Sequence, residues 1–201
     1  MKLVFQMNER GLKVLSEMVA SNANAWPVAA ELRAHWLAFD AEAIRRAARL
    51  PFVIFDARFA DEVWWRAISR NPELTTVTSN DRPAWPAQAG EDLMGELLVF
   101  AWHMVRLDHL VARLTLGILP GVGASLTALT PQHIRHIATR HARVLELRWT
   151  NDPAFWSRLL IAALNADDRA LSDIHLHAQL RLSSALMADA ISPLGVGDDG
   201  Y

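Results

Sequence analysis

The chain has 201 residues, of which 52% are hydrophobic and 21% are charged, and its formal net charge is −2. This composition is typical of a folded globular protein and argues against a polybasic nucleic-acid binder, so any DNA contact would require a local basic patch or a more basic partner. The sequence contains no cysteine, which excludes disulfides, thiol catalysis and cysteine-based zinc sites.

The first part of the chain, residues 1–70, is predicted to be a helical unit. Its N-terminal apolar stretch is too short for a signal peptide. Asp40 is a good N-cap for a short helix, and Asp61 is a candidate N-cap for a further helix that carries two adjacent tryptophans. Between these helices, residues 52–58 form an apolar, extended-looking segment that is consistent with a strand or with a helix end.

Residues 71–91 are predicted to be a linker, because prolines and a glycine lie there among polar residues. The longest helix is predicted to start near Asp92, since apolar residues recur at spacings of four and three from Leu93 to Leu114. Its most apolar stretch, Leu97 to Val105, is interrupted by His103 and is much shorter than the roughly 20 residues of a membrane span. We therefore expect a soluble, cytoplasmic protein with no membrane partner.

The rest of the chain is predicted to form a second helical unit over residues 92–190, followed by a flexible tail at 191–201. Thr130 is a good N-cap, and the proline that follows it occupies the first helical position, where its missing N–H costs nothing. An extended segment is predicted near 143–149, and a helix with an adjacent Phe-Trp pair comes after it. The last helix is predicted to begin near Asp167.

The two predicted units are related by a weak internal repeat. Ile44 matches Ile134 about 90 residues later, and one inserted residue, placed after Asp61, brings Trp65 onto Trp156. Acidic, basic, aromatic and apolar residues stay in the same order over about thirty positions. We therefore interpret the chain as two diverged copies of one structural unit.

Four short segments of the second unit share their order and approximate spacing with a known family. These segments are Leu114–Ile118, Ala128–Gln132, Val144–Trp149 and Leu171–His175. Over about residues 92–187 the chain resembles FlhD, the small helical subunit of the flagellar master activator, which works with a DNA-binding partner, FlhC. It departs from the family where Leu114-Thr115 replace a Phe-Arg pair, and the lack of cysteine excludes a family-type intersubunit disulfide.

The resemblance implies a mainly α fold in which two tandem FlhD-like units form an intramolecular pseudo-dimer. It also implies a transcription regulator or co-activator subunit, connected with flagellum biogenesis, that acts in an oligomer. Its partner would be FlhC-like or another protein, and DNA would be reached through the complex. The alternative is an interaction module on the same scaffold that does not bind DNA, such as an anti-activator, an adaptor or a secretion-system accessory.

The most basic stretch of the chain is 131–148, in which Glu146 is the only acidic residue. Arginine suits phosphate contact because its guanidinium donates two parallel hydrogen bonds. The alternative is a solvated helix face whose arginines pair with acids elsewhere. The candidate DNA contacts are Arg135, Arg140, Arg143 and Arg148.

Two further sets of residues are candidates for protein–protein contact. Part of the predicted heptad stripe is expected to mediate oligomerisation, namely Leu97, Phe100, Met104, Leu107 and Val111. The candidate partner-binding residues are His175, Leu180 and Trp156. For the aromatic residues, packing in the core is the alternative.

Nothing in the sequence predicts catalysis. His133 and His136 are three residues apart on one predicted helix and could ligate a metal, but no HExxH or equivalent motif accompanies them, so solvated or capping histidines are the favoured interpretation. Residues 117–123 are glycine-rich but lack the Gly-Lys-Ser/Thr ending of a phosphate-binding loop. We therefore expect no enzymatic activity, no cofactor and no metal site.

Overall fold

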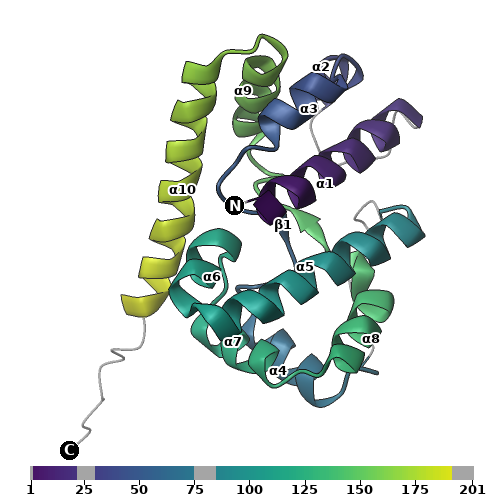
Figure 1. The fold of residues 1–201 in the computed structure, drawn as a ribbon, viewed down its shortest axis with the longest axis vertical. Helices are drawn as coiled ribbons and strands as arrows, with labels where there is room; N and C mark the ends of the chain where they lie inside the picture. Colours follow the sequence, from purple (N-terminus) through teal and green to yellow (C-terminus); the bar gives the residue numbers. More distant parts are fainter. Residues whose placement is uncertain (1, 22–29, 75–84, 192–201) are drawn as a thin grey trace, which may run out of the picture.

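The computed structural model describes residues 2–21, 30–74 and 85–191, and within these ranges the chain is mainly helical, as the sequence predicts (Figure 1). The predicted tail beyond residue 191 and the centre of the predicted linker, residues 75–84, lie outside the described residues.

The described elements are helices of 5 to 24 residues and two strands of two residues each. The helices are α1 (Lys2–Ser21), α2 (Arg33–Leu37), α3 (Ala41–Ala47), α4 (Glu62–Arg70), α5 (Ala87–Leu107), α6 (His109–Leu116), α7 (Pro120–Thr127), α8 (Pro131–His141), α9 (Pro153–Leu164) and α10 (Asp168–Ile191). The other elements are the 3-10 turns η1 (Ala30–Leu32) and η2 (Ala142–Val144) and the strands β1 (Phe55–Asp56) and β2 (Glu146–Leu147).

The helix predicted from Asp92 onward differs from the one observed at both ends. It begins at Ala87, within the segment predicted as a linker, and it ends at Leu107. Asp108 then adopts an extended conformation, and its side chain accepts hydrogen bonds from the amides of Leu110 and Val111 at 2.9 and 3.0 Å. This cap starts a separate helix, α6, so the apolar stripe that looks continuous in the sequence is divided between two helices.

The two strands join distant parts of the chain. They pair antiparallel, with Phe55 opposite Leu147 and Asp56 opposite Glu146. They lie within the segments predicted to be extended near 52–58 and 143–149. Helix α4, which carries Trp64 and Trp65, and helix α9, which carries Phe155 and Trp156, therefore each follow one strand of the same two-stranded sheet.

Matching structural details recur around this sheet. Asp61 caps α4 by accepting from the Trp64 amide at 2.9 Å, and Asp152 caps α9 by accepting from the Phe155 amide at 3.0 Å. By this cap Asp61 matches Asp152, whereas the sequence alignment pairs it with Asn151. Under the two-unit interpretation, this match moves the inserted residue to a position before the strands.

The indole groups of the two aromatic helices follow the same pattern. Trp65 donates from Nε1 to the carbonyl of Ala57 at 3.0 Å, and Trp156 donates from Nε1 to the carbonyl of Arg148 at 3.2 Å. Each donor lies eight residues after its acceptor. Both tryptophans are fully buried, so each hydrogen bond satisfies an indole N–H that could not reach water.

The helices that follow the strands pack against the opposite half of the chain. Helix α4 packs on α7, and α9 packs on α2 and α3. In Figure 1, α9 accordingly lies with α2 and α3 in the upper part of the molecule, whereas α4 lies below with α7 and α8. Helix α10 runs along one side and contacts α9 and α6.

The interior is one continuous apolar core that includes five buried tryptophans, of which Trp36, Trp65 and Trp156 are fully buried. Asn8 is buried within it, but its amide donates to the carbonyls of Ala48 and Phe52 and accepts from the Ile54 amide, so its polar groups are satisfied.

No helix in the described ranges is by itself long and apolar enough to cross a membrane. Helices α6 and α7 pass that test only when they are taken together, and the chain bends by 113° between them.

Candidate functional site

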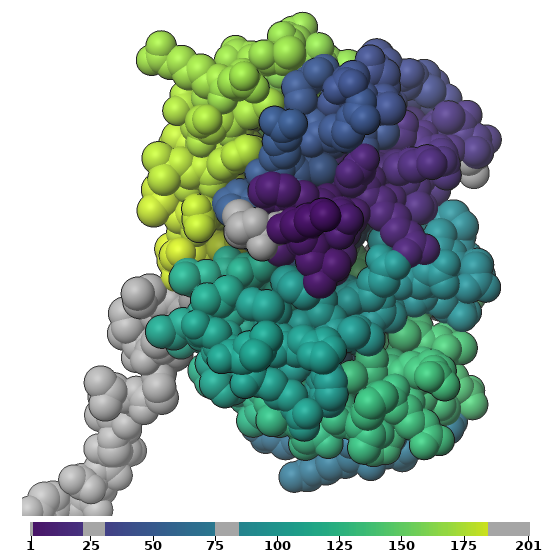
Figure 2. Space-filling view, viewed as in Figure 1, coloured from purple at the N-terminus to yellow at the C-terminus, as the bar shows by residue number. Residues whose placement is uncertain are grey.

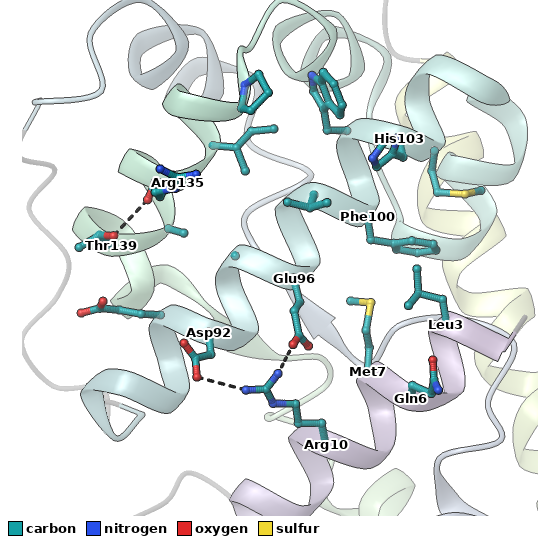
Figure 3. A pocket seen from close by; sticks show the side chains of 18 of the residues that line it. Leu3, Gln6, Met7, Arg10, Asp92, Glu96, Phe100, His103, Arg135 and Thr139 are labelled. Carbon is teal, nitrogen blue, oxygen red and sulfur yellow. Dashed lines mark hydrogen bonds and ion pairs between the residues drawn. The ribbon is translucent and has the colours of Figure 1, made fainter.

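A long groove runs along the outer face of α5. Helix α5 forms its floor, α1 forms one wall through Leu3 to Arg10, and α8 forms the other wall through Pro131 to Thr139 (Figure 3). Its volume is about 1320 Å³. In the space-filling view, α5 lies at the surface between α1 and α8 (Figure 2).

The groove exists because α5 buries only part of its circumference. Residues such as Leu93, Leu97 and Ala101 point into the core and are almost inaccessible. The opposite face, from Gln88 to Leu107, has no helix of the described chain above it and lines the groove. An apolar helix with one uncovered face is a feature of interaction surfaces.

One end of the groove is acidic. Asp92, Glu91 and Glu96 line it, and Arg10 from α1 forms ion pairs with Asp92, at 3.1 Å, and with Glu96 (Figure 3). Gln88 also donates to Asp92 at 2.9 Å. Three carboxylates therefore face one guanidinium at this end.

The other end of the groove is apolar and aromatic. Val99 is 45% exposed and Leu107 is 81% exposed, although both are large apolar side chains. Trp102 is fixed by a 2.9 Å hydrogen bond from its indole to the carbonyl of Leu129, and the guanidinium of Arg106 lies 4.2 Å from the centre of its ring. An anchored indole ring beside exposed apolar side chains suits this part of the groove to contact with another apolar surface.

The predicted DNA-binding arginines do not lie in one uniform setting. Arg135 is exposed on the α8 wall of the groove, and Arg143 is exposed beyond the end of α8. Arg140 is also exposed, but it forms a 2.9 Å ion pair with Glu73, which His136 contacts at the same distance. Surface pairs of this kind contribute little free energy, so Arg140 could exchange its partner.

Arg148, the fourth predicted DNA contact, is engaged inside the fold. Its side chain is 12% exposed and donates to the carbonyls of Val53 and Leu116 and to the carboxylate of Asp56. This guanidinium ties the strands to the end of α6, and it is not part of the exposed basic surface. The residues that hold Arg148 inside the fold lie far from it in the sequence, so the sequence pattern around Arg148 does not show its burial.

The predicted oligomerisation residues divide between the core and the surface. Leu97, at 1% exposure, and Phe100 are buried within this chain, and Met104 is partly buried against the core. Leu107 and Val111 are exposed. Leu107 and Val111 are therefore the most accessible of the five, and Met104 is accessible from the groove that it helps to line.

The predicted partner-binding residues are similarly divided. Leu180 is exposed on α10, whereas Trp156 is buried in the core. His175 is partly buried, its Nε2 has no hydrogen-bond partner in the fold, and burial lowers the pKa of its imidazole below the usual value of 6.5. It is thus held preferentially in the neutral form.

Within the described ranges, no group of three or more His, Asp or Glu side chains is arranged to hold a metal ion. His133 and His136 both lie on α8, as predicted, and His136 contacts Glu73.

Comparison with protein-family profiles, with curated proteins and with solved structures finds no match to this chain. The FlhD resemblance therefore stays a prediction, and the function has to be argued from the geometry.

The groove itself was not predicted from the sequence. The periodicity of α5 indicates a helix with apolar residues on several sides, but it does not show which of them the rest of the chain covers. Arg10 and Glu96 come from elements far apart in the sequence, and no motif links them. The only available signal was the excess of apolar residues over what one buried stripe requires.

Proposed function

We propose that this protein is an interaction subunit of a regulatory assembly, and that it binds a protein partner through the groove on α5. The observation that carries this proposal is the exposure of large apolar side chains, Val99 and Leu107, along a groove with fixed walls. Exposed apolar surface that is rimmed by polar and charged groups is typical of protein-binding sites.

We also propose that the chain is an intramolecular pseudo-dimer, in which two related units pair through β1 and β2 and exchange their aromatic helices. Support comes from the equivalent caps at Asp61 and Asp152 and the equivalent indole bonds of Trp65 and Trp156. The reciprocal packing of α4 on α7 and of α9 on α2 also supports it. Whether these units are FlhD-like rests on the sequence resemblance.

A second candidate function is the FlhD-like co-activator, which would contact DNA as part of a complex. The exposed arginines on and beyond α8, Arg135, Arg140 and Arg143, favour it. In this proposal the partner supplies most of the phosphate contacts, because three arginines are few for a DNA-binding surface and the chain's net charge is −2.

Site-specific photo-cross-linking in the source cells tests the main proposal. A photoreactive amino acid at position 99 or 107 is expected to give a discrete adduct with a second protein, because both positions lie in the groove. Val63 is the matched control, since it is a valine that is 76% exposed on α4, outside the groove. Absence of an adduct from both groove positions would contradict the proposal.

A salt-titrated DNA-binding assay tests the second candidate. The protein together with the cross-linked partner should bind DNA with an affinity that falls as salt rises, and replacing Arg135 and Arg143 with Ala should reduce that dependence. If the variant complex has the wild-type salt dependence, these arginines do not contact phosphate.

A further inference from the structure

We infer that the ligand of the α5 groove is an amphipathic α-helix of about five turns from a partner protein, with a basic residue at one end and apolar residues along the rest. This inference rests on the proposed function and specifies the shape and chemistry of the partner. It follows from the length of the groove and from the distribution of charged and apolar residues along it.

The dimensions of the groove match those of a helix. Its floor extends from Gln88 to Leu107, which at about 1.5 Å per residue is roughly 30 Å, the length of a helix of about twenty residues. Near the middle of the floor, a Cβ placed on Gly95 would meet the Cβ of Ala138 on α8 at 3.7 Å, so α8 packs closely against α5 there and forms a continuous wall beside the floor.

The chemistry of the groove changes along its length. Three carboxylates, those of Glu91, Asp92 and Glu96, line the groove together with two guanidiniums, those of Arg10 and Arg135. Arg10 pairs with Asp92 and Glu96, so a bound segment gains from a lysine or arginine near Glu91. Val99 near the middle of the floor and Leu107 at its other end are exposed and suit leucine-like side chains. An amphipathic helix presents such residues at spacings of three and four on one face.

Other occupants fit this arrangement less well. A small molecule would occupy only part of the groove, because small-molecule pockets have volumes of about 300–1,000 Å³ and this groove has about 1320 Å³. Nucleic acid would meet the acidic end.

A second copy docking through its own α5 would also be disfavoured by charge. If the two α5 helices ran parallel, the acidic ends around Glu91 would face and repel each other. If they ran antiparallel, the acidic end of each copy would be buried against the apolar end of the other without a basic partner.

A displayed library of twenty-residue helices, panned against the full chain, tests the inference. We expect the enriched helices to carry apolar residues at i, i+3, i+4 and i+7 and a lysine or arginine at one end. Val99→Glu should weaken their binding by about tenfold or more, because it places a charge on the apolar floor, whereas Val63→Glu should change it less than about twofold.

A charge exchange tests the basic end separately. Glu91→Lys should weaken the selected helices by about tenfold, and replacing their basic residue with Glu should restore binding to that variant. The inference is overturned if no enriched helix is sensitive to Val99→Glu, or if the charge exchange restores nothing. If the helix experiments fail but the cross-linking experiment gives a groove adduct, the proposed function is supported and only the inference of a helical partner is contradicted.

Discussion

At the scale of single residues, the sequence predicts Arg148 to be a surface contact for DNA, whereas the structure places it in the interior, where it connects separate segments. It lies at the end of the most basic stretch of the chain, yet its donors reach carbonyls at Val53 and Leu116 and the carboxylate of Asp56. These acceptors belong to two separate parts of the chain, the segment around β1 and the end of α6. Arg148 therefore acts as a cross-link between β1, α6 and the segment that follows β2.

Replacing this guanidinium should be costly. Arg148→Met leaves two carbonyls and a partly buried carboxylate without their donor, so we expect the free energy of unfolding to fall by about 2–4 kcal/mol. Urea unfolding followed by circular dichroism measures the change. Arg143→Met, at an exposed position, is the control and should change stability by less than about 0.5 kcal/mol. Equal effects of the two substitutions would mean that the internal contacts of Arg148 contribute little.

His175 gives the fold a dependence on pH. Burial lowers the pKa of its imidazole in the folded state, so below about pH 6.5 the unfolded chain binds a proton that the folded chain resists. The free energy of unfolding should therefore fall as the pH drops below that value. His175→Leu should remove this contribution, as measured by chemical unfolding between pH 7.5 and about pH 5.

The control for His175 is His177, which is exposed on the same helix. Because His177→Gln leaves His175 in place, it should retain the wild-type loss of stability at low pH. If His175→Leu loses as much stability on acidification as the wild type, other groups cause the effect.

At the scale of elements, α1 and α5 each contain a glycine in the helix interior, and tertiary packing gives these glycines different roles. A Cβ on Gly11 would collide with the ring of Phe55, which lies on β1 directly against α1. A Cβ on Gly95 would meet only Ala138, at an ordinary contact distance of 3.7 Å. Helix propensity alone would favour alanine at both positions by about 1 kcal/mol.

The two alanine substitutions should therefore have opposite effects. Gly11→Ala should lower the free energy of unfolding by about 1–3 kcal/mol, because Phe55 has to move out of a packed core. Gly95→Ala should be neutral or raise it by up to about 1 kcal/mol. Thermal unfolding of both variants under identical conditions measures the difference, and a gain in stability from Gly11→Ala would contradict the packing of α1 against β1.

At the scale of the whole molecule, helices α4 and α9 each pack against helices that lie far from them in the sequence. Helix α4 completes the packing of α7, and α9 completes the packing of α2 and α3. If one part unfolds, the other loses a helix that covers its core. Cooperative unfolding is the expected consequence.

We predict a single unfolding transition for the whole chain. Tryptophan fluorescence, which reports on Trp36, Trp65 and Trp156 in the core, should follow the same urea curve as helical circular dichroism. Two separate transitions, or curves that do not coincide, would mean that the parts unfold independently in spite of the packing of α4 and α9.

The sequence by itself determined the local features of the fold. Its composition and periodicity predict a mainly helical chain, and Asp40, Asp61 and Thr130 each cap the helix that the sequence assigns to them. It also indicated that the environments of Trp65 and Trp156 are related. Caps and apolar spacing act within a few residues, so they can be read directly from neighbours in the chain.

The tertiary structure alone decided where these elements go and which faces stay exposed. It divided the long helix at Asp108, drew Arg148 into the interior and buried Leu97 while leaving Val99 and Leu107 in an open groove. All three of these side chains are apolar, and the packing of distant helices covers Leu97 but leaves Val99 and Leu107 exposed. The candidate site is therefore a product of contacts between α1, α5 and α8 that no local pattern encodes.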